Sequence, residues 1–287
     1  MENSKSADVP TGEEEKSFFG IIIHSFFIIP FLIAVFALLL FAAVRILTHE
    51  QQTVYDYLND VKIGASTKRW QAAFELSKIL ANPRLIPKEG RFADELKNAF
   101  VNAEHDDHRV RQYLALAMGR TGDQTFVAPL VAAVKEDKQE NLYAIIYALG
   151  MLRDKNSAPD IYPFLEYPDS KIRLAAVIAL GSIGNQDGIA FIKKVLNDPE
   201  PNVQWDAAIA LAKMGDASGK EVLLKLFDRQ YLSGFGEVDA QEQNHILVVA
   251  LEAAANLSDP QLDQAITQLG QSDQNMNVRK KALELIK

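Results

Sequence analysis

The residues best able to carry chemistry stand together in one short run, Glu104-His105-Asp106-Asp107-His108. Carboxylates and imidazoles are common ligands of divalent metals, so this run is the first candidate for a metal site. The same residue types are ordinary caps at the start of a helix, and the run precedes an apolar, helix-like segment. We favour the capping role and predict no metal site, no cofactor site and no catalytic residue.

Other motifs of catalysis or nucleotide binding are missing from the sequence. Gly234-Phe235-Gly236 lacks the third glycine and the strand–helix setting of a dinucleotide-binding loop. The sequence has no phosphate-binding P-loop, no His-Glu-x-x-His motif and no Gly-x-Ser-x-Gly nucleophile elbow. It has no cysteine, which excludes disulfides, thiolate metal ligands and cysteine nucleophiles. We therefore expect a protein that is not an enzyme and that has no small-molecule substrate.

The charge balance argues against nucleic acid as a partner. The formal net charge is −8. A strongly acidic chain repels a phosphate backbone unless one face is locally basic, so we expect no nucleic-acid binding.

An apolar segment near the N-terminus predicts a membrane anchor. Residues 18–44 contain no Asp, Glu, Lys or Arg. As a helix, the stretch from Phe26 to Val44 spans roughly 28 Å, close to the hydrocarbon thickness of a bilayer. A cleaved signal peptide is the alternative, but its apolar region is normally shorter and follows a basic start. Here three glutamates stand at positions 13–15 before the segment, so we predict a single-pass membrane protein.

The flanking charges predict the orientation of this anchor. Lysine and arginine are enriched on the cytoplasmic side of membrane proteins. The N-terminal tail has Lys5 and Lys16, whereas the other flank has Arg45, Lys62, Lys68 and Arg69. We therefore expect the part of the chain after the anchor to be cytoplasmic.

The rest of the chain repeats one pattern. Four copies follow at intervals of 31 residues: LALAMGRTGD (114–123), IIYALGMLRD (145–154), AVIALGSIGN (176–185) and AAIALAKMGD (207–216). More divergent copies lie at 72–81, 250–259 and 278–286. Each copy predicts an Ala- and Leu-rich helix that ends near glycine, a turn with Asp or Asn, and a second amphipathic helix. Because such short helices are marginal alone, we predict an all-α solenoid of about six repeats.

The repeat resembles the HEAT repeat, in the short bacterial form also found in phycobilin lyases. Three pairs carry the resemblance: Val110-Arg111, Ile172-Arg173 and Val278-Arg279. Asp107 and Asp169 stand four residues before the first two arginines, as in the Asp–Arg ladder of that family, while Tyr143 and Gln204 replace the arginine in two units. The resemblance implies the fold, and this fold serves many unrelated tasks.

A linker joins the anchor to the repeats. Val54, Leu58 and Val61 fall on one helical face, so the membrane helix is expected to continue outward until Gly64. Two interpretations stay open: a spacer packed on the first repeat, or a docking surface for another membrane protein. The predicted parts are an acidic flexible tail (1–17), a transmembrane helix (18–45), a juxtamembrane helix or linker (46–65) and the solenoid (66–287).

Two insertions break the period, at residues 83–91 and 228–243. Insertions in solenoids often lie on the binding face. The second contains Tyr231, Leu232 and Phe235, which could anchor a partner or fold back onto the solenoid.

A set of lysines on neighbouring second helices is the other candidate for partner binding. In HEAT solenoids those helices line the concave surface, so this basic stripe would meet an acidic partner. The lysines are Lys193, Lys194, Lys220 and Lys225.

These features predict a membrane-anchored scaffold or adaptor that binds a partner protein, including integral membrane proteins, as a subunit of or accessory to a membrane complex. The alternative is a lyase or cofactor-attachment enzyme, which the resemblance to phycobilin lyases alone implies.

Overall fold

The computed structural model describes residues 24–47 and 52–286, which form two units, Met1–Gln52 and Thr53–Lys287. The predicted acidic tail over residues 1–17 lies outside the described residues. Each unit is described by itself.

The first unit contains the predicted apolar helix. A π-helical turn, η1 (His24–Ile28), leads into α2 (Ile29–Leu47). Pro30 stands at this junction, where a residue without a backbone N–H fits an altered hydrogen-bond register. The stretch Phe26–Val44 is long and apolar enough to cross a membrane, and none of it is buried by other described residues.

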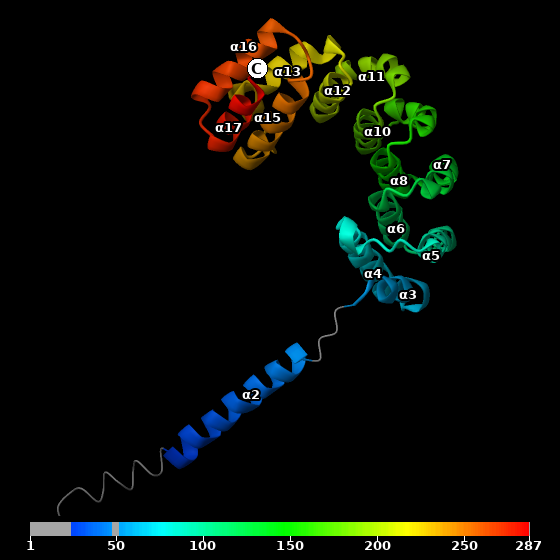
Figure 1. Ribbon diagram of the computed structural model, residues 1–287, viewed down its shortest axis with the longest axis vertical. Helices are drawn as coiled ribbons and strands as arrows, with labels where there is room; N and C mark the ends of the chain where they lie inside the picture. The colour runs from blue at the N-terminus through cyan, green and yellow to red at the C-terminus, as the bar shows by residue number, and fades with distance from the viewer. Residues whose placement is uncertain (1–23, 48–51, 287) are drawn as a thin grey trace, which may run out of the picture. The chain divides into compact units, whose positions relative to one another are not determined.

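The second unit is an array of helix pairs (Figure 1). No strand occurs in residues 52–286, so the predicted all-α solenoid is confirmed. Its α-helices are α3 Val54–Ile63, α4 Ser66–Ile79, α5 Gly90–Asn102, α6 His108–Thr121, α7 Val127–Glu136, α8 Gln139–Leu152, α9 Ala158–Ile161, α10 Ser170–Ile183, α11 Ile189–Lys194, α12 Pro201–Lys213, α13 Lys220–Leu226, α14 Arg229–Ser233, α15 Ala240–Ala254, α16 Pro260–Ser272 and α17 Met276–Leu285. Short 3₁₀ turns are η2 Pro83–Leu85, η3 Gln124–Phe126, η4 Lys155–Ser157, η5 Tyr162–Glu166, η6 Gln186–Gly188, η7 Val195–Asn197 and η8 Ala217–Gly219.

The segment before the first repeat is a separate helix. A capping box between Thr53 and Asp56 starts α3, and Gly64 follows its last residue. Val54, Leu58 and Val61 are buried, and α3 packs on α4 and α5. Of the two interpretations, packing on the first repeat is the one observed, and α3 belongs to the compact unit Thr53–Lys287. The predicted start of the repeats at residue 66 stays a prediction. Docking of another protein on this segment stays a prediction.

Small residues bring the first helices of successive repeats into close contact. These first helices are α4, α6, α8, α10, α12, α15 and α17, and each contacts the next. A Cβ placed on Gly150 of α8 would lie only 2.6 Å from the Cα of Ala179 on α10. Gly119 and Gly181 meet the following helix in the same way. Only glycine allows this approach, because any side chain would push the two backbones apart.

The close approach of the first helices sets the direction in which this unit bends. Figure 1 shows α6, α8 and α10 on the inner side of the bend and α5 and α7 on the outer side. The expectation that second helices line the concave surface is therefore wrong for this chain. The physical reason is that the first helices, with their Gly and Ala contacts, are the more closely spaced layer.

Three buried ion pairs form a second set of contacts between repeats. Arg173 donates from Nε and Nη2 to Asp198, at 2.7 and 2.8 Å, and from Nη1 to the Tyr167 carbonyl. Arg111 pairs likewise with Asp137, and Arg229 with Asp273. Each arginine thus reaches an aspartate that lies later in the chain.

The ladder therefore differs from the one expected from sequence. Asp107 pairs with Arg109 rather than Arg111, and Asp169 caps α10 through the Lys171 N–H. Tyr143 does not stand at the arginine position, because it lies exposed on the surface of α8. The residue that contacts Asp137 from α8 is Asn141, whose Nδ2 donates over 2.7 Å.

We expect Arg173→Ala to lower the free energy of unfolding by about 3 kcal/mol, because Asp198 would be left buried without its partner. Urea unfolding of the detergent-solubilised chain, followed by circular dichroism, measures this change. Arg91→Ala removes an exposed ion pair with Glu95 and should leave the midpoint almost unchanged. Equal effects of the two substitutions would contradict a structural role for the ladder.

Left-handed residues end the first helices, as the glycine spacing predicts. Gly122, Gly184 and Gly215 have φ of +70°, +66° and +79°. The equivalent position of α8 is Arg153, the one non-glycine residue with positive φ in the described chain, at 56°. A side chain in this conformation costs about 1–2 kcal/mol, so this cap is strained relative to the glycine caps.

We expect Arg153→Gly to raise stability by about 0.5–1 kcal/mol, since the relief of strain exceeds the added flexibility of the unfolded chain. Gly184→Ala is the matched reverse change, because the place that its Cβ would take is open space and only φ is unfavourable. It should lower stability by about 1 kcal/mol. Thermal unfolding of both variants measures the changes. A loss of stability in Arg153→Gly would show that Arg153 makes a stabilising contact.

Candidate protein-binding face

Large and mostly apolar side chains, some of them exposed, recur on the first helices, of which α6, α8 and α10 lie on the inner side of the bend (Figure 1). They occupy two positions of each repeat, one turn apart, which we call the inner stripe. Its exposed members include Phe74 at 36%, Tyr143 at 47% and Tyr147 at 36% relative exposure. The full stripe comprises Trp70 and Phe74 on α4, Gln112 and Leu116 on α6, Tyr143 and Tyr147 on α8, Leu174 and Ile178 on α10, and Trp205 and Ile209 on α12.

Ring contacts, one within the stripe and one with the neighbouring Tyr113, hold its aromatic side chains in place. Tyr143 and Tyr147 stack with centroids 6.2 Å apart and an interplanar angle of 13°. Phe74 meets Tyr113 edge to face at 5.1 Å, across two helices. Rings that are already ordered lose little freedom on binding, which suits them to anchoring a partner.

The insertion after α13 covers one end of the stripe. Phe235 meets Trp205 edge to face at 4.9 Å, and Trp205 Nε1 donates to the Tyr231 hydroxyl over 3.1 Å. Leu232 is completely buried, and Trp205 keeps only 7% exposure. The insertion thus folds back onto the solenoid, which is the alternative that the sequence left open. Partner binding by Tyr231, Leu232 and Phe235 stays a prediction, and Leu232 could take part only if the insertion opened.

A cleft of about 380 Å³ lies beside Trp205, between α10, α12, the insertion and α15. Its apolar lining is Leu174, Ile209, Val238 and Ile246, and its carboxylates are Glu200, Asp206, Glu237 and Glu242. Burial raises the pKa of Asp206 from 3.8 to about 6, and the charges of Lys213 and His245 only partly oppose this. The cleft thus combines an apolar wall with a partly desolvated carboxylate.

The raised pKa makes a prediction about stability. An acid whose pKa is higher in the folded than in the unfolded protein destabilises the fold once it ionises, so stability falls as pH rises from about 4 to above 6. We expect Asp206→Asn to stabilise the protein by up to about 3 kcal/mol at pH 7.5 and by little at pH 4. Thermal unfolding at the two pH values tests this, with Asp263→Asn, an exposed position on α16, as the control. An equal gain at both pH values would contradict it.

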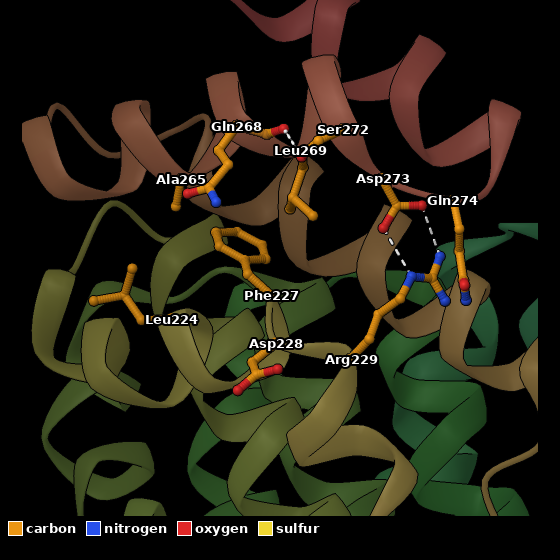
Figure 2. A pocket seen from close by; sticks show the side chains of 10 residues that line it. All are labelled: Leu224, Phe227, Asp228, Arg229, Ala265, Gln268, Leu269, Ser272, Asp273 and Gln274. Carbon is orange, nitrogen blue, oxygen red and sulfur yellow. Dashed lines mark hydrogen bonds and ion pairs between the residues drawn. The ribbon is translucent and has the colours of Figure 1, made fainter.

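A second cleft, of about 510 Å³, lies between α13, α14, α16 and the turn before α17 (Figure 2). Its main charged pair is Arg229 with Asp273, and Nη1 of Arg229 is buried without a hydrogen-bond partner among the described residues. Arg229 donates to both Asp273 oxygens, at 2.7 and 2.8 Å, and to the Asn244 side-chain oxygen at 2.8 Å. Phe227 and Leu269 form its apolar wall. Arg229 joins the ladder described above, so we assign this cleft a structural role.

The predicted basic stripe lies on the second helices α11 and α13, and its charges are largely neutralised. Lys193 pairs with Asp216 at 2.8 Å, and Lys220 pairs with Asp259 at 2.7 Å. Lys194 lies 3.8 Å from Glu166, while Lys225 is exposed with no ion pair to any residue in 52–286. Binding of an acidic partner by these lysines stays a prediction, but two of them already serve as links between repeats.

The acidic and histidine-containing run forms the turn before α6. Asp107 accepts a hydrogen bond from the Arg109 N–H at 3.0 Å and thereby caps this helix. Asp106 pairs with Arg69 of α4 at 2.5 Å. Within residues 24–47 and 52–286, no three His, Asp or Glu side chains gather as metal ligands would.

Comparisons with known proteins support the repeat assignment. Residues 158–232 match the family model described as HEAT repeats. A bilin biosynthesis protein, PecE of Nostoc sp. strain PCC 7120, is 26% identical over 125 residues, which cover 43% of this chain and 45% of PecE. The match thus spans less than half of that relative.

One solved structure with a TM-score above 0.5 shares the fold, and a second gives a lower score. The complex of CpcE and CpcF of phycocyanin lyase from Nostoc sp. PCC7120 gives a TM-score of 0.57 at 23% identity, covering 83% of this chain and 96% of the matched one. An archaeal HEAT-like repeat protein from Thermococcus onnurineus gives 0.44 at 14% identity, covering 83% and 97%. The prediction of HEAT-like repeats of the phycobilin-lyase type is confirmed.

Proposed function

We propose that this HEAT-like repeat protein is a membrane-anchored adaptor that binds a partner protein along the inner stripe of its solenoid. The observation that carries the proposal is the exposure of aromatic side chains at stripe positions of α4 and α8, namely Phe74, Tyr143 and Tyr147, each of which contacts another ring. Core packing does not require large rings at these positions, because the close contacts between first helices are made by glycine and alanine. Contiguous exposed apolar surface of this kind is typical of interaction sites.

The apolar helix α2 supports the anchoring part of the proposal. Its stretch Phe26–Val44 has the length and composition of a membrane span, and the described residues bury none of it. With the solenoid on the cytoplasmic side, as the flanking lysines and arginines favour, the anchor would raise the local concentration of partners in the same membrane. Integral membrane proteins and subunits of membrane complexes are thus the partners we favour.

The experiment is affinity purification of the full chain from detergent-solubilised native membranes. We expect a partner to co-purify in stoichiometric amount, and Tyr143→Ala with Tyr147→Ala to reduce its recovery about tenfold or more, as the loss of two aromatic anchors does. Both residues are exposed, so the folded state should persist, which circular dichroism checks.

Two controls distinguish the inner stripe from other surfaces. Val101→Ala removes an exposed apolar side chain from α5 on the outer side, and should leave recovery unchanged. Lys225→Ala tests the basic stripe on the second helices. If Lys225→Ala lost the partner and the double tyrosine variant kept it, the inner stripe would not be the binding face.

A second candidate is a lyase or cofactor-attachment activity, which the similarity to PecE favours. A protein of this kind would carry tetrapyrrole pigment when purified from a pigment-producing host, without a stoichiometric protein partner. Visible absorbance of the purified chain, measured beside the co-purification, separates the two candidates.

A further inference from the structure

The cleft beside Trp205 differs from the rest of the solenoid in how its carboxylates are neutralised. Three aspartates at other repeat junctions, Asp198, Asp216 and Asp273, pair with arginine or lysine. Among residues 52–286, no lysine or arginine forms an ion pair with any of the four cleft carboxylates, Glu200, Asp206, Glu237 and Glu242. The chain therefore collects negative charge here, and Lys213 and His245, whose charges act on Asp206, form no ion pair with it.

Asp206 is the least exposed of these four carboxylates. It lies on α12 at the cleft wall and accepts no hydrogen bond from any described side chain or backbone N–H. Burial raises its pKa, which shows that its charged form is poorly solvated. An unpaired, partly buried carboxylate lowers stability, and a cation that enters the cleft would recover that loss.

The lining of the cleft indicates which kind of cationic group would fit beside Asp206. Leu174, Ile209 and Ile246 line the cleft together with Asp206, and Phe235 and Val238 of the insertion also line it. An aliphatic stem with a charged, planar end fits this combination better than a compact ion, because the stem can lie on the apolar wall.

We propose that the cleft receives an arginine side chain from a basic segment of the partner, with Asp206 as the carboxylate that pairs with its guanidinium. The inference rests on the proposed binding of a protein along the inner stripe, since Leu174 and Ile209 belong both to the stripe and to the cleft. The neighbouring glutamates attract the basic segment, and Asp206 fixes the guanidinium in place.

The test uses the full chain in detergent micelles and three capped tripeptides. Leu-Arg-Leu is the probe, Leu-citrulline-Leu keeps the shape without the charge, and Leu-Glu-Leu reverses the charge. The chain has two tryptophans, Trp70 and Trp205, so Trp70→Phe leaves Trp205 as the reporter beside the cleft. Calorimetry measures the affinity, and Trp205 emission reports where the probe binds.

We expect saturable binding of Leu-Arg-Leu with a change in Trp205 emission, and binding of the other two peptides weaker by about tenfold or more. Asp206→Asn should weaken binding of Leu-Arg-Leu by a similar factor. The same substitution should raise the unfolding temperature at pH 7.5, so misfolding could not explain the weaker binding. Glu221→Gln, an exposed carboxylate on α13 outside the cleft, is the matched control and should bind normally.

Equal affinity for the arginine and citrulline peptides, no saturable binding, or full binding by Asp206→Asn would overturn the proposal. Preference for Leu-Glu-Leu would do so as well. The arginine-site proposal and the adaptor proposal can fail independently of each other. A partner lost on tyrosine substitution, with no probe binding, refutes only the arginine site. Probe binding without any co-purified partner refutes only the adaptor.

Discussion

The contact between glycine and alanine on successive first helices is the constraint on which this solenoid depends. Gly119, Gly150 and Gly181 each meet an alanine of the next helix at distances that leave no room for a further methyl group. This spacing fixes one layer of helices closer together than the other and so decides which side of the array is inner. It also leaves larger side chains of the same helices, such as Tyr143, pointing away from the core.

The buried ion pairs complement this packing at the other end of each helix. Arg173 and Arg111 each contact an aspartate of the following repeat and a backbone carbonyl of the preceding turn or helix. A buried pair of this kind contributes little net stability, but it penalises any change of register between repeats. Packing and ladder together make neighbouring repeats a fixed unit rather than a flexible string.

Much of the fold could be predicted from the sequence, because the period, the helix-ending glycines and the turn aspartates are local signals. The ladder partners could not, because spacing within one helix suggests Asp107 for Arg111, whereas the observed partner, Asp137, is set by how repeats stack. Arg153 shows the same limit, since a position read as glycine in three repeats is filled by arginine in the fourth. Predictions of the binding surface were less complete. The basic stripe lies on the second helices, which the resemblance to HEAT repeats places on the concave surface. In this protein the first helices α6, α8 and α10 lie there instead (Figure 1). The inner stripe was missed, although its signal was available: Tyr143 and Leu174 stand 31 residues apart and precede the same motif.

The insertion has a consequence for the size of any ligand that lies along the solenoid. Phe235 and Tyr231 of the insertion pack against Trp205 on α12. The stripe residues of α8, by contrast, are exposed. A bound segment that starts at α4 would meet this resident aromatic group after α10. Under the binding proposed above, a longer ligand would have to displace the insertion or turn aside into the acidic cleft.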